Sequence, residues 1–393
     1  MYDFDKEVMR RGSGCVKWDE NSGDDIIPMW VADMDFEASP AIREALRRRV
    51  EHGVFGYTHV PESYYEAIIS WFDRRHGWPI QREWIQYTSG VVPALSVIVK
   101  ALTQPGDRVI LQTPVYNCFF SSVRNNGCEV VTSMLRQRHS PQNRFEMDYE
   151  DLEQKARDPR TRLLILCNPH NPVGRVWTRE ELARVNNICK ENGVIVVSDE
   201  IHNELTYHGR YVPFGTVGMD NAIICTSPSK SFNTAGLQNA NIICARPEWR
   251  AEIDRAININ EVCDVNPFGV VALEAAYNES EAWLDELCNY LWQNYETLTG
   301  FFKSELPQLP VTPLEGTYLV WVDIRPTGLS SDALTERLLN EGKVRVNSST
   351  MYGCEGFIRL NIACPRNQMM EGLQRIKGVI ERQRTTTLRP PSK

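Results

Sequence analysis

Short apolar, β-branched runs alternate with helix-like stretches, and this alternation limits the folds open to the 393-residue chain more than any other feature. Six runs are predicted strands: Arg108–Leu111, Glu129–Thr132, Leu163–Cys167, Val194–Ser198, Ala222–Thr226 and Asn241–Ala245. Their apolar positions are continuous rather than alternating, as expected for a parallel sheet covered on both faces. The pattern predicts an α/β fold, a mostly parallel sheet sandwiched by helices.

The second half of the chain has a different pattern. A long helical region follows Pro267 and reaches Leu306. Beyond it the sequence predicts strands and helices of a smaller α+β domain: Thr317–Asp323, Ser331–Glu341, Lys343–Val346, Phe357–Asn361 and a helix from Arg366 to about Arg384. We therefore expect an N-terminal segment (1–45) that associates with the small domain, a large domain (46–285) and a C-terminal small domain (286–393), with a frayed tail from Thr385.

Charge and cysteine content exclude several classes of protein. The 43 Lys and Arg against 51 Asp and Glu give a net charge of −8, so no overall positive field attracts nucleic acid or a membrane surface. The charged start of the sequence is not typical of a secretion signal, and no run approaches the ~18 apolar residues of a membrane span. Eleven cysteines without Cys-x-x-Cys spacing, several of them in strand-like runs, fit a reducing cytoplasm.

Polar groups follow three of the predicted strands at the point where each strand ends. Residues 168–174 contain two Asn-Pro pairs, residues 199–202 begin with Asp199, and residues 227–233 contain Lys230. Ligands of parallel sheets bind beyond the carboxyl ends of the strands. An amide, a carboxylate and an amine are therefore expected to meet in one crevice.

Each of these groups also has an ordinary structural interpretation. An Asn-Pro pair often forms a turn, a carboxylate after a strand often caps a helix, and most lysines are solvated. Lys230 differs because it stands between serines directly after a buried strand, where burial lowers the pKa of an amine and favours a Schiff base. A reactive lysine, an aspartate and a phosphate-holding loop together indicate a pyridoxal-phosphate site.

Another group of residues suggests a catalytic metal as an alternative. The residues with metal-like composition are His170, Asp199, Glu200, His202, Glu204 and His208. They lack the His-Glu-x-x-His spacing of a zinc site, so we expect no metal.

The segments Asn168–Gly174, Asp199–His202 and Ser227–Leu237 resemble the fold-type I aminotransferase superfamily, and more closely its cystathionine β-lyase-like branch of carbon–sulfur lyases. The resemblance extends from Tyr2 to Arg366, nearly the whole chain. It implies that the large domain binds pyridoxal 5′-phosphate.

The resemblance implies a role for each group around the cofactor ring. Lys230 would hold the cofactor and later move the proton of the substrate Cα. Asp199 would face the pyridine nitrogen, and Asn171 would bond the ring's 3-oxygen, with His202 close by. Tyr116 would stack on the ring; simple core packing is the alternative for this tyrosine.

The resemblance places the cofactor phosphate at the start of a helix that runs to about Leu102. Free amides at a helix start bind anions, and here they belong to Gly90, Val91 and Val92. Ser227 and Ser229 would assist, whereas Gln238 stands where many aminotransferases place an arginine on the phosphate.

Tyr57 looks like the tyrosine that reaches the phosphate from a neighbouring subunit, so we expect a homodimer with shared active sites. The alternative is a surface aromatic residue in a glycine-flanked turn.

Three positions bear on the substrate. Arg359 lies in a strand pattern, and the resemblance places its guanidinium on the substrate carboxylate beside Asn171; a structural ion pair is the alternative. The backbone at Ala32 would close over the same carboxylate. Asn117 follows Tyr116 where close carbon–sulfur lyases commonly have a second tyrosine, which bears on substrate range.

The expected function is β-elimination from cystathionine or an L-cysteine S-conjugate, which yields a thiol, pyruvate and ammonia. An aminotransferase on the same scaffold is the first alternative, because it shares every cofactor residue. A regulator-binding protein is the alternative from another class, since some relatives of this scaffold contact transcription regulators. The expected partners are a small sulfur amino acid and a second copy of the chain, with no nucleic acid and no membrane.

Overall fold

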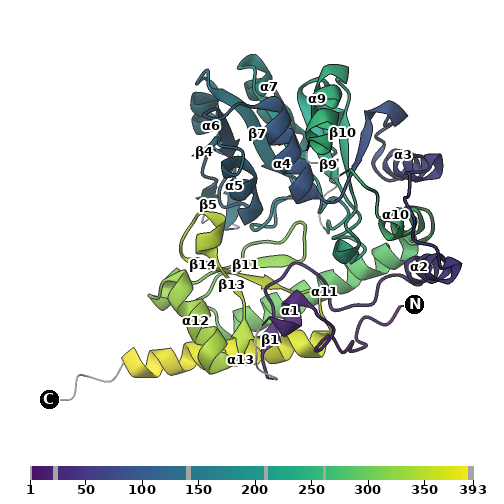
Figure 1. Cartoon of the computed structure of the whole chain (residues 1–393). Coiled ribbons are helices and arrows are strands. Elements are labelled where there is room, and N and C mark those ends of the chain that lie inside the picture. The colour runs from purple at the N-terminus through teal and green to yellow at the C-terminus, as the bar shows by residue number, and fades with distance from the viewer. Residues whose placement is uncertain (1, 21–24, 139–142, 208–210, 260–262, 388–393) are drawn as a thin grey trace.

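A seven-stranded sheet forms the centre of the larger lobe in the computed structural model, which describes residues 2–20, 25–138, 143–207, 211–259 and 263–387 (Figure 1). The strands, in spatial order, are β2 (Ile85–Thr88), β10 (Ala240–Cys244), β9 (Ala222–Thr226), β8 (Ile195–Asp199), β7 (Thr161–Cys167), β3 (Arg108–Leu111) and β4 (Glu129–Thr132). The strands β9, β8, β7, β3 and β4 are parallel. The predicted α/β fold with a mostly parallel sheet is confirmed.

One edge of this sheet departs from the prediction. β10 lies antiparallel to both β9 and β2, so the run predicted as Asn241–Ala245 is a strand but not a parallel one. β2 was not predicted, because its sequence Ile-Gln-Tyr-Thr carries only a short apolar signal.

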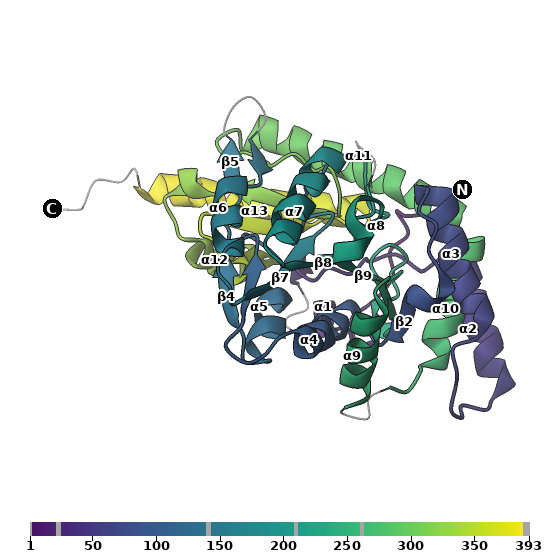
Figure 2. The same cartoon turned by 90° about the horizontal axis from the view of Figure 1, so that it is seen from above.

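Alternate side chains of each central strand enter two separate cores. Val109 and Leu163 pack with α4 (Val91–Leu102), α5 (Asn117–Arg124) and α9 (Pro247–Asn258). Ile110 and Leu164 belong to the other core, with α6 (Tyr149–Ala156) and α7 (Arg179–Glu191). Figure 2 shows these two helix layers on opposite sides of the strands. The continuous apolar runs follow from this double burial.

The smaller lobe is built around a three-stranded antiparallel sheet. It contains β11 (Leu319–Asp323), β14 (Phe357–Asn361) and β13 (Asn347–Ser348), with α11 (Glu281–Glu305), α12 (Ser331–Gly342) and α13 (Arg366–Thr387). The run predicted as Lys343–Val346 forms β12 (Val344–Arg345), which pairs in parallel with β1 (Ile27–Pro28) instead of joining this sheet. α13 continues to Thr387, and the rest of the predicted frayed tail lies outside the described residues.

The predicted division into domains stays a prediction. Its boundary at 45/46 falls within α2 (Pro40–His52), and its boundary at 285/286 falls within α11. α2 packs on α10 (Pro267–Glu279), which also contacts α3 (Glu62–His76). The remaining short elements are α1 (Val16–Asp19), α8 (Gly215–Gly218) and the hairpin β5–β6 (Arg136–Arg138 and Arg144–Glu146).

Two further observations concern the environment of the chain. In the part that the structure describes, no helix combines the length and the apolar character that a membrane span needs. All eleven cysteines are free thiols.

Candidate active site

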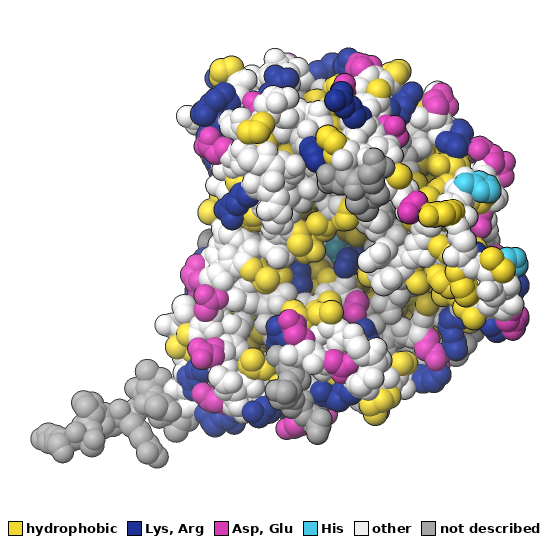
Figure 3. All heavy atoms as spheres, viewed as in Figure 1, with side chains coloured by type: hydrophobic (Ala, Val, Ile, Leu, Met, Phe, Trp, Pro, Cys, Tyr) yellow, Lys and Arg dark blue, Asp and Glu magenta, His cyan; other side chains and the backbone are white. Residues whose placement is uncertain are grey.

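A cavity of about 190 Å³ lies where the carboxyl ends of β7, β8 and β9 meet. Figure 3 shows the surface hollowed between the two lobes. The sheet register places Cys167 beside Asp199, and Asp199 beside Cys225, so the three strand ends are adjacent. The cavity is lined by ten residues that the sequence had indicated: Ala32, Gly90, Val91, Val92, Tyr116, Asn171, Asp199, His202, Ser229 and Lys230.

Lys230 reaches the cavity from the loop that follows β9. Its Nζ donates a hydrogen bond of 2.6 Å to the backbone carbonyl of Ala32. Burial lowers the pKa of Lys230 to about 8, against the opposing attraction of Asp33 and Asp199. A substantial fraction of this amine is therefore neutral near pH 7 to 8, the form that reacts with carbonyl groups.

Asp199 ends β8 and is 3% exposed. Its Oδ1 accepts a hydrogen bond of 3.0 Å from the backbone amide of Ile201. Burial raises the pKa of Asp199 to about 7, although this amide and Lys230 both favour the charged form. A cationic N–H group placed in the cavity would meet a carboxylate that lacks a strong counter-ion.

His202 and Asn171 face the same cavity from the loops after β8 and β7. The imidazole of His202 is buried, its Nδ1 has no partner among the described residues, and burial lowers its pKa well below the usual value. The Oδ1 of Asn171 accepts a hydrogen bond of 3.0 Å from Arg359. A neutral imidazole and an amide are thus available to hydrogen-bond a ligand.

The end of the cavity next to α4 is suited to an anion. Gly90 precedes α4 with no side-chain cap, so the first amides of the helix are open to a ligand. Ser229, Gln238 and Asn239 complete this end of the cavity. Ser227 does not line the cavity: its Oγ donates to the backbone carbonyl of Asn239 (2.6 Å) and accepts from the amide of Ser229 (3.1 Å).

Arg359 is buried at 3% exposure in β14. It donates from Nη1 to Asn171 and from Nη2 to the carbonyl of Trp30 (2.8 Å), and its Nε has no partner within the described chain. Among the described residues no carboxylate forms an ion pair with this guanidinium, so the structural ion pair considered as the alternative is not seen. A buried guanidinium in this state fits an incoming carboxylate.

Four predicted site residues lie outside the cavity lining: Ser227 and Arg359, described above, and Asn117 and Tyr57. Asn117 is the first residue of α5, next to Tyr116, and is half-buried. Tyr57 is 99% exposed, and it does not reach the cavity of its own chain.

Several residues at the site were not found from the sequence. Tyr318 donates from its hydroxyl to the carbonyl of Ala32 (2.9 Å), while Ile201, Ala235 and Asn239 line the cavity. Tyr318 stands in a strand-like run that is typical of core packing, and no local motif marks it. The only indication of Asn239 in the sequence was its position directly after Gln238.

The residues with metal-like composition belong to separate networks. His170 bonds the carbonyl of Pro114, Glu200 bonds Tyr211, and Glu204 bonds His76. Within the described ranges no three His, Cys, Asp or Glu side chains are placed to hold a metal ion. His208 lies outside those ranges.

Comparisons with known proteins agree with this site. The model of the aminotransferase class I and II family matches residues 24–376. The chain is 42% identical to cystathionine β-lyase PatB of Bacillus subtilis (strain 168), over 96% of this chain and 99% of that protein. The structure of cystalysin from Treponema denticola, which contains pyridoxal 5′-phosphate, has a TM-score of 0.93 and 31% identity, over 97% of this chain and 99% of that chain. The pyridoxal-phosphate-bound C–S lyase from Staphylococcus hominis has a TM-score of 0.90 and 34% identity, over 96% and 99% of the two chains.

The fold and the site define a pyridoxal-phosphate-dependent enzyme of the fold-type I architecture. The chain belongs to the aminotransferase class I and II family. Its own residues fit the cofactor: Lys230 has a lowered pKa, and the amides at the start of α4 are open. Within the part of the chain that the structure describes, Asp199 forms no ion pair within 4 Å and the Nδ1 of His202 has no partner.

Proposed function

We propose that this chain cleaves cystathionine or another L-cysteine S-conjugate by β-elimination, giving a thiol, pyruvate and ammonia. It is a pyridoxal-phosphate-dependent carbon–sulfur lyase. The observation that carries the substrate proposal is the buried guanidinium of Arg359, which has no carboxylate partner in the described residues and lies next to Asn171 at the cavity. An α-amino acid supplies the missing carboxylate.

The chain's own side chains account for binding and proton transfer. Pyridoxal phosphate supplies an electron-withdrawing ring that weakens a bond at the substrate Cα. Arg359 would hold the substrate carboxylate and so would set the orientation of the bonds at Cα. Lys230, whose lowered pKa makes the neutral amine more available than in a solvated lysine, would take the Cα proton; a positioned base of this kind contributes about 10²–10⁴-fold. Asp199 would keep the proton on the ring nitrogen.

The residue roles proposed for the cofactor follow the same geometry. Asn171 would hydrogen-bond the 3-oxygen of the ring, with His202 close by, and Tyr116 would stack on the ring. The amides of Val91 and Val92 would bind the phosphate. The bonds of Ser227 support a different role from the one expected, since its hydroxyl proton is held by a backbone carbonyl and it orients Ser229 instead.

A direct assay tests the lyase proposal. Purified protein mixed with cystathionine is expected to release pyruvate, ammonia and free thiol in equal amounts without any keto acid. Lys230→Ala is expected to abolish this release and the visible absorption of the lysine-bound cofactor. An aminotransferase would instead need a keto acid acceptor and would release no ammonia, and that result would contradict the proposal.

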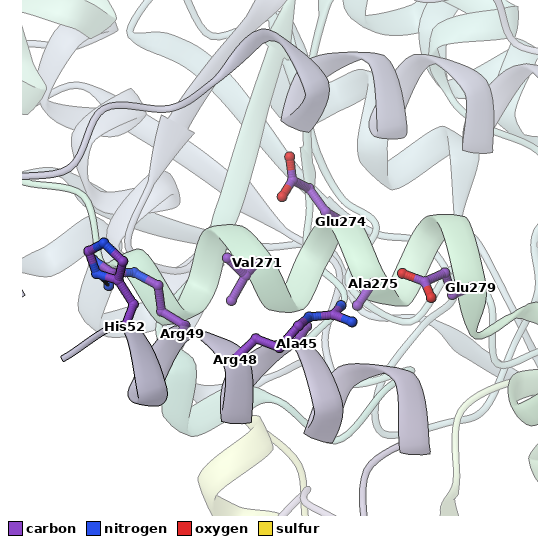
Figure 4. A pocket seen from close by; sticks show the side chains of 8 residues that line it. All are labelled: Ala45, Arg48, Arg49, His52, Val271, Glu274, Ala275 and Glu279. Atoms are coloured by element: carbon purple, nitrogen blue, oxygen red, sulfur yellow. Dashed lines mark hydrogen bonds between the residues drawn. The ribbon is translucent and has the colours of Figure 1, made fainter. Parts of the chain in front are cut away.

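The surface around α2 supports a homodimer. Val54, Phe55 and Tyr57 follow α2 and are 63%, 57% and 99% exposed, a group of neighbouring apolar side chains of the kind that a partner chain can cover. Beside them a groove of about 410 Å³ runs along the contact between α2 and α10 (Figure 4). Its lining carries both charge signs, with Arg48 and Arg49 on α2 and glutamates on α10, so two copies related by a two-fold axis can place opposite charges together.

We propose that a second copy of the chain covers this surface and that Tyr57 serves the phosphate of the neighbouring site. The full exposure of its ring on its own chain supports that role. The free state of all eleven cysteines supports the further proposal that the enzyme works in a reducing cytoplasm.

A further inference from the structure

A segment near the N-terminus crosses the cavity between the two lobes without joining any sheet. We call this segment, Trp30–Phe36, the strap. Five consecutive carbonyls of the strap, from Trp30 to Met34, each accept a hydrogen bond from a side chain. Side chains therefore hold most of the strap, and one backbone hydrogen bond, from the amide of Asp35 to the carbonyl of Ala363 (2.9 Å), adds to them.

One group of these bonds comes from the active site itself. Arg359 donates to the carbonyl of Trp30, and Lys230 donates to the carbonyl of Ala32. Asn361 bonds the carbonyls of Val31 and Asp33 (2.5 and 2.7 Å). The position of the strap thus decides where the two functional cations of the site rest.

A second group of bonds comes from Arg10, which lies on the outer side. Its Nη1 donates to Asp35 (2.6 Å), to the carbonyl of Met34 (3.0 Å) and to Asp33 (3.2 Å), while its Nη2 donates to Asp33 at 2.7 Å. One guanidinium therefore ties three consecutive residues of the strap together. Charge-assisted bonds of this kind are stronger than neutral ones.

Lys17 completes the cluster from α1. Its ammonium is almost fully buried and pairs with Asp35 at 2.8 Å, with Asp33 3.6 Å away. Asp35 also accepts from Trp18 and Gln368 (2.8 and 3.0 Å), so this carboxylate is held from several directions.

We infer that Arg10 is a positioning residue of the active site, which fixes the strap and neutralises Asp33 beside Lys230. The inference rests on the proposed function only for its effect on substrate binding. Asp33, Asp199, Arg359 and Cys118 act on Lys230 through their charges, with Asp33 the foremost of them, and His202 and Tyr116 face it in the same cavity. Arg10, together with Lys17, offsets the charge of Asp33, the carboxylate that acts most strongly on Lys230.

Two substitutions in this cluster are expected to move the pKa of Lys230 in opposite directions. Arg10→Gln removes the nearer of the two cations that pair with Asp33, Lys17 being the other, and is expected to raise the pKa of Lys230. Asp33→Asn removes the negative charge and is expected to lower that pKa. The measurement is the pH dependence of Lys230 acetylation by acetic anhydride in the cofactor-free, full-length chain. Arg43→Gln, which removes an exposed ion pair with Glu37, is the matched control and is expected to change nothing.

A third variant separates charge from position. Arg10→Lys keeps the positive charge but lacks the fork that reaches three strap residues, so the pKa of Lys230 is expected to stay near that of the wild type. The KM for a cysteine S-conjugate is expected to rise about tenfold in both Arg10 variants, with a smaller change in kcat, because the strap carbonyl of Trp30 no longer holds Arg359 in place.

The outcomes distinguish the two proposals. Shifts of the same sign in Arg10→Gln and Asp33→Asn, or no shift in either, would overturn the role of Arg10. The acetylation measurement does not depend on turnover. If Arg10→Gln and Asp33→Asn shift the pKa of Lys230 in opposite directions but the wild-type protein releases no pyruvate, the lyase proposal is refuted and the role of Arg10 is supported. If Arg10→Gln does not fold, Asp33→Asn and Arg10→Lys still test the inference. An unchanged pKa of Lys230 in Asp33→Asn contradicts it.

Discussion

Burial acts on Lys230 and Asp199 in opposite directions. It lowers the pKa of the amine to about 8 and raises the pKa of the carboxyl group to about 7, so both groups titrate close to neutral pH. Neither group would have this property on a solvated surface. In the cofactor-free chain, burial of these two ionisable groups therefore lowers the free energy of unfolding, and the bound cofactor provides an interaction for each of them.

Asp199→Asn tests that cost. The folded cofactor-free chain keeps the Asp199 proton up to about pH 7, whereas the unfolded chain releases it near pH 3.8, the ordinary pKa of an aspartate. The free energy of unfolding contributed by this group therefore falls as the pH rises from 4 to 7. We expect Asp199→Asn to be more stable than the wild type at pH 8, by up to about 4 kcal/mol, and equal to it at pH 4.

Urea titrations of the cofactor-free proteins at the two pH values measure this difference. Asp158→Asn is the control with the opposite sign, because the bond with the backbone amide of Arg160 and the nearby Arg108 lower the pKa of Asp158. That variant is expected to lose stability at pH 8. Equal stability of Asp199→Asn and the wild type at pH 8 would contradict the raised pKa.

At this scale the sequence named most groups that the cavity brings together, because Lys230, Asp199 and Asn171 follow strands in local motifs. It missed Tyr318, whose partner Ala32 lies 286 residues away along the chain, and the role of Arg10, whose partners lie 23 to 25 residues away without any regular spacing. Contacts across such separations depend on how the lobes pack, and a local pattern carries no information about them. Tyr57 stays a prediction for the same reason.

The start of α4 is the element that most directly shapes the anion end of the cavity. Val91 is its first helical residue, and the preceding Gly90 is extended, a combination that accepts proline without disturbing the helix. Val91→Pro would remove one amide donor. We expect it to weaken the binding of pyridoxal phosphate about 10- to 100-fold, the loss of one hydrogen bond to a charged group.

Val91→Ala is the matched control, because it loses the buried side chain but keeps the amide. The dissociation constants of both variants can be measured by titration calorimetry, with circular dichroism to confirm that α4 is retained. Similar affinities in the two variants would mean that this amide does not bind the phosphate.

Short apolar, β-branched runs were the easiest elements to predict. The strands β3 and β9 have the bounds that the sequence indicated, and so does the edge strand β4, in which only Val131 is buried. The direction of β10 and the partner of β12 were not predictable, because strand pairing depends on the path of the chain between strands. An apolar run predicts that a segment is a strand, but it does not predict which strand pairs with it or in which direction.

The whole molecule is expected to function as a pair of chains. If Tyr57 completes the neighbouring site, each active site contains Lys230 from one chain and Tyr57 from the other. Tyr57→Ala and Lys230→Ala then remove residues that different chains contribute to the same site. A hybrid of these two variants contains one site with both residues intact. Mixing the two weak variants under conditions that exchange subunits is therefore expected to restore up to about a quarter of the wild-type activity, since about half of the dimers are hybrids with one working site.

Sedimentation velocity before and after mixing shows whether dimers form and exchange. A mixture of Lys230→Ala with Asp199→Asn is the control, because both changes damage the same site and the hybrid contains no intact one. A mixture of Tyr57→Ala and Lys230→Ala that exchanges subunits but regains no activity would refute the shared site.

The pairing of β1 with β12 joins residues 27–28 to residues 344–345. A ribosome therefore makes the first strand of this pair more than 300 residues before its partner. The large sheet can assemble in the meantime, but the carbonyls that receive Arg359 and Lys230 stay unanchored until the last part of the chain emerges. Synthesis order thus delays a competent catalytic centre until the polypeptide is almost complete, so a truncated product would carry the reactive lysine without the means to direct it.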